Sequence, residues 1–367
     1  MASKGHDTTV RLHIALGVNK AAQSRNGLTA LHHAAANGHS STAQQFIKLG
    51  VDKDAKDKYG WTALHSAASN GHDETVRMLI ELGAEKEAID NVRGTALHHA
   101  AYNGHHETVR LLVDEVCVDM EARDNYRLTA LHIAALEGHD ATVRLLVDVL
   151  GVSKEAKDNF GWTALHVAAF EGHDATVRLL VDELGVDKET KNIYDGTALH
   201  LAASKGQDRI VSLLMDELSV DKKVKDNYGW TALQLAAFEG HDTTVRRLDE
   251  LGVDKEAKDI YGGTALHVAA FEGHDATVRL LVDVLGIDHE AKDTNGTVPQ
   301  TREHLFRHCS RWKDQQKTLW KIVGQATGWK AGRCRHVQIS ELFTIEECDQ
   351  AVMDFLAATE VGKFPPK

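Results

Sequence analysis

The sequence lacks the residues from which disulfide frameworks, zinc sites and membrane spans are built. Its 367 residues include only four cysteines, Cys117, Cys309, Cys334 and Cys348, without a Cys-x-x-Cys pair. Three prolines are present, all after residue 297. No apolar run approaches the roughly 18 residues of a membrane helix, and the first ten residues, MASKGHDTTV, lack the apolar core of a signal peptide. We expect a cytoplasmic or nuclear protein with no membrane segment, no cofactor and no metal.

Basic residues are also fewer than acidic ones. The net charge is −12, yet residues 298–367 contain 11 Lys and Arg against 8 Asp and Glu, so the excess of carboxylates lies before them. Binding to nucleic acid relies on Lys and Arg at phosphates, which an acidic surface opposes. The acidic part therefore favours a basic or neutral protein partner.

What the sequence does contain is a repeat with a period of 33 or 34 residues. The string Thr-Ala-Leu begins at eight positions, which are Thr29, Thr62, Thr95, Thr129, Thr163, Thr197, Thr231 and Thr264. Seven of these strings continue to His, and Gln234 stands there once. Ala-Ala, two variable residues and Gly follow each time, and the segment FEGHDATVRLLVD occurs twice. Eight matches in one register indicate a repeat protein.

One repeat, around Thr163, can be interpreted as two short helices. Thr163 suits a helix N-cap, and Gly172 suits a C-terminal stop with positive φ. Between them, Ala168 and Ala169 share an apolar face with Leu165 and allow another helix to approach closely. A second apolar stripe, around Val177–Val181, predicts the second helix, and the turn-rich residues before Thr163 predict an extended connection. Such a pair buries its apolar stripe only by stacking on neighbours.

The pattern D-x-x-G-x-T-A-L-H-x-A-A-x-x-G-H resembles the ankyrin repeat over roughly residues 1–297. The resemblance implies an all-α solenoid of stacked helix-turn-helix units, each with a short β-hairpin finger, and a small helical tail after it. It places a truncated half repeat at 1–23. The expected full repeats span residues 24–56, 57–89, 90–123, 124–157, 158–191, 192–225, 226–258 and 259–292.

The pattern breaks in three places. Residues 2–7 match the end of a first helix, so Met1 begins inside a repeat, and we expect the chain to be a fragment of a longer protein. The repeat at Thr231 is one residue short in its second helix, which places Asp249 where Val181 or Ile80 packs elsewhere. Burial there would cost on the order of 1–3 kcal/mol, unless the helix end turns Asp249 to water. A ninth repeat begins at residues 293–297 and is aborted at Val298.

Residues 298–367 differ in composition and predict two short helices. The segments Pro299–Cys309 and Asp349–Pro366 resemble the C-terminus of reverse-transcriptase polyproteins from non-LTR retrotransposons. In that family His304 and Cys309 would belong to a metal knuckle, but the upstream cysteine pair is missing, so no metal site is expected. The alternative function is therefore a retroelement-derived chimera whose basic tail contacts nucleic acid.

The 23 histidines are best explained as structural. Seven belong to the Thr-Ala-Leu-His strings and eight to a Gly-His turn. The resemblance implies that both sets tie the Thr cap and the inter-repeat loops together by hydrogen bonds. No catalytic triad, phosphate loop or carboxylate pair is found, and we predict that the protein is not an enzyme.

The predicted function is a non-catalytic scaffold that binds a protein partner as a monomer. A further hypothesis is that it is the recognition part of a larger signalling protein. The resemblance implies binding through the fingers and the variable sites of the first helices, and aromatic residues gather there beside Glu137, Glu171, Glu239 and Glu272. The alternative is that these aromatics pack on neighbouring fingers and stiffen the array. The predicted partner-binding residues are Tyr59, Trp61, Tyr102, Tyr126, Leu136, Phe160, Trp162, Phe170, Tyr194, Tyr228, Trp230, Phe238, Tyr261 and Phe271.

Overall fold

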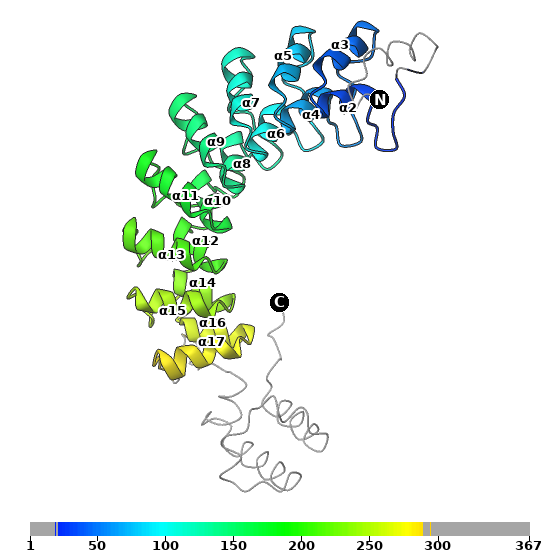
Figure 1. Ribbon diagram of the computed structural model, residues 1–367. Helices are drawn as coiled ribbons and strands as arrows, with labels where there is room; N and C mark the ends of the chain where they lie inside the picture. Colours follow the sequence, from blue (N-terminus) through cyan, green and yellow to red (C-terminus); the bar gives the residue numbers. More distant parts are fainter. Residues whose placement is uncertain (1–18, 20, 289–293, 295–367) are drawn as a thin grey trace, which may run out of the picture. The chain divides into compact units, whose positions relative to one another are not determined.

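A computed structural model describes residues 19, 21–288 and 294 (Figure 1). Contacts between residues divide the chain into two units, residues 1–227 and 228–367, and each is described by itself. The expected half repeat lies mostly outside the described residues, as does all of the aborted repeat except Thr294. The whole tail lies outside them too, including the segments that resemble a retrotransposon protein.

The described part of the first unit contains six repeats, each with a first helix and a second helix (Figure 1). The first helices pack against one another in sequence order. They are α2 (Ala30–Ala36), α4 (Ala63–Ser69), α6 (Ala96–Tyr102), α8 (Ala130–Leu136), α10 (Ala164–Glu171) and α12 (Ala198–Ser204). The second helices are α3 (Ser40–Lys48), α5 (Asp73–Glu81), α7 (His106–Arg110), α9 (Asp140–Arg144), α11 (Asp174–Arg178) and α13 (Asp208–Ser212).

The described part of the second unit repeats the same arrangement twice. Its first helices are α14 (Ala232–Phe238) and α16 (Ala265–Glu272), and its second helices are α15 (Asp242–Glu250) and α17 (Asp275–Arg279). Among the described residues, no helix combines the length and the apolar character needed to cross a bilayer. The predicted all-α stack of helix pairs is thus confirmed.

Repeat length decides how the second helix ends. In five repeats it continues as a π-helical turn, namely η2 (Leu111–Glu115), η3 (Leu145–Val149), η4 (Leu179–Glu183), η5 (Leu213–Glu217) and η6 (Leu280–Val284). In η4, Leu184 donates its N–H to Leu179 O at 2.9 Å, five residues back, whereas in α5 Leu82 donates to Met78 O at 3.1 Å, four residues back. The helices α3, α5 and α15 have no such turn. The longer repeats therefore absorb their additional residue as a π turn.

The first helices are held together by alanine. Ala168 and Ala169 of α10 are fully buried, as are the same pairs in α4, α6, α8, α12 and α14. Side chains this small let the backbones of neighbouring helices approach closely, while Leu165 and Leu180 fill the space between first and second helices. The predicted caps are confirmed, because Thr163 and His166 form a capping box and Gly172 ends α10 with φ of 87°.

The fingers contain no β-strand in the part of the chain that the structure describes. Each expected hairpin is reduced to one turn, as at Asp57, whose N–H donates to Trp61 O at 2.9 Å while Gly60 N–H donates to Asp57 O at 3.0 Å. A five-residue loop closed by these two bonds leaves no room for a ladder. Gly60 has φ of 82°, which suits glycine at this point.

Asp249 is not buried without a partner. It is half-exposed near the end of α15, and its carboxylate lies 3.8 Å from the ammonium of Lys255. The equivalent residues Val181 and Ile80 are also only half-buried. The shorter helix therefore places Asp249 at a boundary position, and the desolvation cost considered for a buried carboxylate does not arise.

Buried threonines recur along the second helices, and the hydroxyls of two of them have no hydrogen-bond partner among the described residues. This difference leads to a stability prediction. Thr176 donates to Asp140 of the preceding repeat at 2.6 Å, but the buried hydroxyl of Thr142 has no partner, because His106 replaces the aspartate there. We expect Thr142→Val to raise the free energy of unfolding by about 1 kcal/mol, and Thr176→Val to lower it by about 1–2 kcal/mol. Urea unfolding of both variants checks this, and equal effects would contradict it.

Candidate interaction surface

Each finger is built around one carboxylate or amide. Asp158 Oδ1 accepts from the backbone N–H groups of Phe160 and Trp162, both at 2.8 Å. Asn192 Oδ1 accepts in the same way from Tyr194 and Gly196, both at 2.9 Å. These paired bonds fix the loop, so the side chain two residues after the Asp or Asn always lies at the finger tip.

Neighbouring fingers are hydrogen-bonded to one another at their tips. Asn159 N–H donates to Tyr126 O at 3.0 Å, and Ile193 N–H donates to Phe160 O at 3.0 Å. The bond recurs within the first unit between every pair of adjacent fingers from Tyr59 to Asn227. In the second unit it joins Ile260 to Tyr228 and Thr294 to Tyr261. The tips therefore form a connected row in each unit.

The tip side chains are apolar and exposed. Their exposed fractions lie between 45% and 60%. The row in the first unit consists of Tyr59, Val92, Tyr126, Phe160 and Tyr194, and the row in the second unit consists of Tyr228 and Tyr261. We call these residues the tip row. Val92 was not among the predicted residues, although its position in the repeat could have revealed it.

The three finger tryptophans are half-buried instead. The centroid of the Trp162 ring lies 5.0 Å from that of Phe170, and the centroid of Trp230 lies 5.1 Å from that of Phe238. Among the other predicted residues on first helices, Tyr102 and Phe271 are exposed at 50% and 72%, and Leu136 is half-buried. Within each unit the predicted residues thus lie on the fingers and the first helices, and the tip row is exposed.

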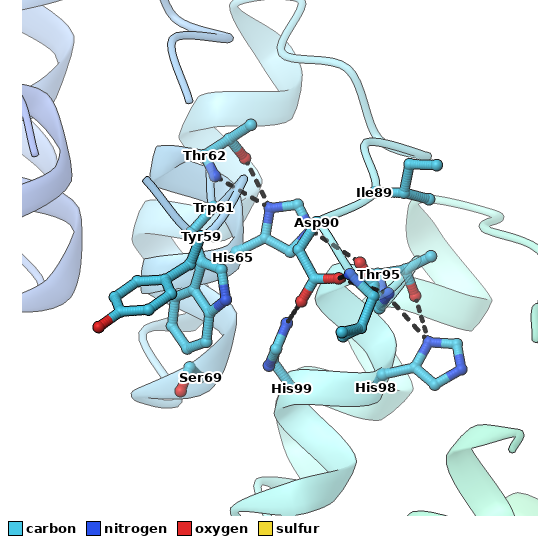
Figure 2. A network of polar contacts seen from close by, with 12 residues as sticks. Tyr59, Trp61, Thr62, His65, Ser69, Ile89, Asp90, Thr95, His98 and His99 are labelled. Atoms are coloured by element: carbon cyan, nitrogen blue, oxygen red, sulfur yellow. Dashed lines mark hydrogen bonds and ion pairs between the residues drawn. The ribbon is translucent and has the colours of Figure 1, made fainter. Parts of the chain in front are cut away.

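Trp61 belongs to a polar cluster between two repeats (Figure 2). Its ring centroid lies 4.2 Å from that of His99, and His99 Nε2 contacts Asp90 Oδ2 at 2.9 Å. Asp90 is buried, and its pKa is lowered by the hydrogen bond from His99 and by backbone N–H groups, which outweigh its burial. His99 was not among the predicted site residues. The cluster fixes Trp61 between the two fingers.

The histidines of the Thr-Ala-Leu-His strings connect repeats, as predicted. Thr163 N–H donates to His166 Nδ1 at 3.2 Å, so His166 carries its proton on Nε2, which lies 3.2 Å from Gly196 O of the next finger. Gln234 makes the same two bonds, with Thr231 N–H and Gly263 O, both at 2.9 Å. In the second histidine set, His173 Nε2 lies 2.7 Å from Leu136 O of the preceding repeat.

Burial lowers the pKa of five of these string histidines. Desolvation outweighs the bond to Gly196 O and lowers the pKa of His166 to about 4, and the pKa of His65 is lowered to about 4 mainly by the same cause. The pKa values of His32, His98 and His132 are also lowered. Among the described residues, no group of three or more His, Cys, Asp or Glu side chains is placed to hold a metal ion.

The charges along the first-helix ends are uneven. Glu171, Glu239 and Glu272 are exposed and Glu137 is half-exposed, whereas the same position of the repeat 192–225 holds Lys205. The Lys205 ammonium lies 4.6 Å from the centroid of the Phe170 ring. Lys205 and Asn192 were not predicted as site residues, although each departs from its position in the other repeats.

Comparison with known proteins agrees with this geometry. A family model described as ankyrin repeats in three copies matches residues 1–90, 82–158, 118–192, 149–226 and 199–293. No curated protein matches the chain.

Proposed function

The chain belongs to the ankyrin-repeat family, and from this premise we propose that it is a non-catalytic scaffold that holds a protein partner on the face formed by the tip row and the first helices. Arrays of this family are generally interaction modules rather than enzymes. The proposal extends to a role as part of a larger signalling protein. The nucleic-acid alternative depends on the tail, which lies outside the described residues.

The observation that carries the proposal is the exposure of the tip row. Apolar side chains exposed by about half their surface are normal when scattered singly. Here five such residues stand side by side on a row of hydrogen-bonded fingers in the first unit. A rigid row of aromatic side chains loses little conformational entropy on binding, which favours an interface. The half-buried tryptophans beneath it act mainly as its support.

A tip-row variant tests this proposal. We expect the triple variant Tyr126→Ala, Phe160→Ala, Tyr194→Ala to reduce partner capture at least tenfold, because it removes three adjacent anchors worth about 1–2 kcal/mol each. Thermal stability should change little, because these side chains are exposed. Quantitative mass spectrometry of proteins captured by the full-length chain measures the effect, and circular dichroism verifies the fold.

The matched control changes three exposed residues of the second helices and π turns, with Arg110→Ala, Val149→Ala and Asp182→Ala. Partners that depend on the tip row should be retained by this control. A set of captured proteins that is unchanged by the tip-row variant, or lost equally with the control, would contradict the proposed binding face.

A further inference from the structure

The Trp162 and Trp230 sites have the same geometry but different hydrogen bonding. The rings of Trp162 and Phe170 are inclined at 60°, and those of Trp230 and Phe238 at 55°. At the second site, Trp230 Nε1–H donates to Asp259 Oδ2 of the next finger at 3.2 Å. The residue equivalent to Asp259 at the first site is Asn192.

The amide of Asn192 is turned so that a donor replaces this acceptor. Its Oδ1 accepts from two backbone N–H groups, which leaves Nδ2 on the opposite side. A Cβ placed on Gly196 would lie 3.2 Å from Asn192 Nδ2, and one placed on Gly263 would lie 2.9 Å from Asp259 Oδ2. Asn192 Nδ2 therefore occupies the place of Asp259 Oδ2.

By equivalence with the Trp230 site, the Trp162 indole N–H and the Asn192 amide N–H are two neighbouring donors. Within the described part of the chain, neither Trp162 Nε1 nor Asn192 Nδ2 has a hydrogen-bond partner. Asn192 as a whole is only 8% exposed, but its Nδ2 atom is not fully enclosed and still reaches the surface. A donor that reaches the surface exchanges a water for an external acceptor on binding, and a carboxylate forms the stronger, charge-assisted hydrogen bond.

A cation contacts the aromatic ring on which Trp162 packs. The Lys205 ammonium lies over the Phe170 ring, and no carboxylate of the described residues forms an ion pair with it. Glu171 and Asp195, which are close in sequence to Phe170 and Asn192, are exposed. Asn192 and Lys205, the two residues that make this spot basic and donor-rich, occur in the same repeat.

We propose that Trp162, Asn192 and Lys205 form a binding site for a carboxylate, supplied by an Asp or Glu side chain of a protein segment lying on the tip-row face. The site rests on the proposed function and names one element of the partner. The two N–H groups donate to the carboxylate oxygens, and Lys205 supplies the charge. At Trp230, Asp259 already provides the carboxylate from within the chain.

A small probe tests the site without a known partner. N-acetyl-glutamate N-methylamide is titrated into the ¹⁵N-labelled full chain, with the glutamine analogue as the uncharged control. We expect saturable shifts of the Trp162 indole N–H and the Asn192 side-chain NH₂ with the glutamate probe, and at least tenfold weaker binding of the glutamine analogue. Trp162→Phe and Asn192→Asp assign the two signals.

Two variants decide the outcome. Asn192→Asp introduces the residue found at this position in other fingers, and it should abolish probe binding while restoring the indole hydrogen bond. The double variant Asp259→Asn, Glu272→Lys transplants the site to Trp230 and should create probe-dependent shifts there. Absent shifts, equal binding of the glutamine analogue, or a folded double variant that gains no binding would each overturn the proposal. Because the probe requires no partner, these results are independent of the tip-row experiment.

Discussion

Lowering the pH from 6.5 towards 4 is expected to destabilise the array strongly, because the histidines that connect its repeats must remain neutral. His65 and His166 have pKa values lowered to about 4, and burial is the main cause for both. His166 accepts the N–H of Thr163 at Nδ1. A proton on Nδ1 would place a donor against that donor and a charge in a buried site.

The direction of the pH effect follows from linkage. Below pH 6.5 the unfolded chain binds protons at these histidines, whereas the folded chain resists protonation until pH about 4. The stability is therefore complete above pH 6.5 and is lost progressively as the pH falls through this window. A single histidine of this kind accounts for about 2 kcal/mol of the loss at pH 5. His32, His98 and His132 contribute in the same direction.

Gln234 shows how to test this, because it makes both bonds without a titrating group. We expect His166→Gln to change the free energy of unfolding by less than about 1 kcal/mol at pH 7.5. At pH 5 the variant should have lost about 2 kcal/mol less than the wild-type chain. Urea unfolding followed by circular dichroism at both pH values measures this difference. His106→Gln changes an exposed histidine and is the control. Parallel pH dependence of the wild-type chain and His166→Gln would contradict the linkage.

The sequence predicts the stack because the same physical requirement recurs at each repeat. A capping threonine, two small residues and a glycine specify a short helix, and eight occurrences specify a stack. The intervals of 33 and 34 residues were visible too. They did not reveal where the additional residue goes, since an extra residue fits equally well in a loop or a helix. That outcome depends on the packing of two buried residues, Leu180 within η4 and Leu184 directly after it.

The candidate site was only partly predictable for a similar reason. Aromatic residues at the tips stand out in the sequence, and the structure places them at an exposed edge. The state of each tryptophan instead depends on a residue about 30 positions later, such as Asp259 or Asn192. An Asp-to-Asn change is inconspicuous in a finger because Oδ1 plays the same part in both. It changes the site only through the atom that faces the indole.

Deleting one residue is expected to have very different effects in the two kinds of repeat. Removal of Val181 from η4 shortens a 34-residue repeat to the length of the repeat 57–89, which already folds with an uninterrupted α-helix. Leu184 then bonds four residues back instead of five, as Leu82 does. We expect a loss of about 1 kcal/mol or less in the free energy of unfolding, because Val181 is only half-buried.

The matched control removes Ile80, a half-buried residue of α5 in the same unit. The 33-residue repeat has no π turn that could convert to α-helix and absorb the deletion. Every residue after the deletion therefore rotates by about 100° around the helix axis. Ala84, which is buried and bonds to Leu79 O, is then drawn out of register. We expect a loss of at least about 3 kcal/mol, comparable to the removal of a large core side chain. Urea unfolding of both deletions compares them directly.

Inserting a valine between Leu79 and Ile80 completes the comparison. The insertion should be accommodated as a π turn, because Leu79 and Ala84 correspond to Leu180, within η4, and Val186, beyond its end. A similar large loss for both deletions would contradict the idea that the π turn stores the additional residue. If the insertion costs little while the Ile80 deletion costs much, the second helix tolerates length change in one direction only. A helix can bulge by one residue while both of its ends remain packed, but it cannot stretch to replace one.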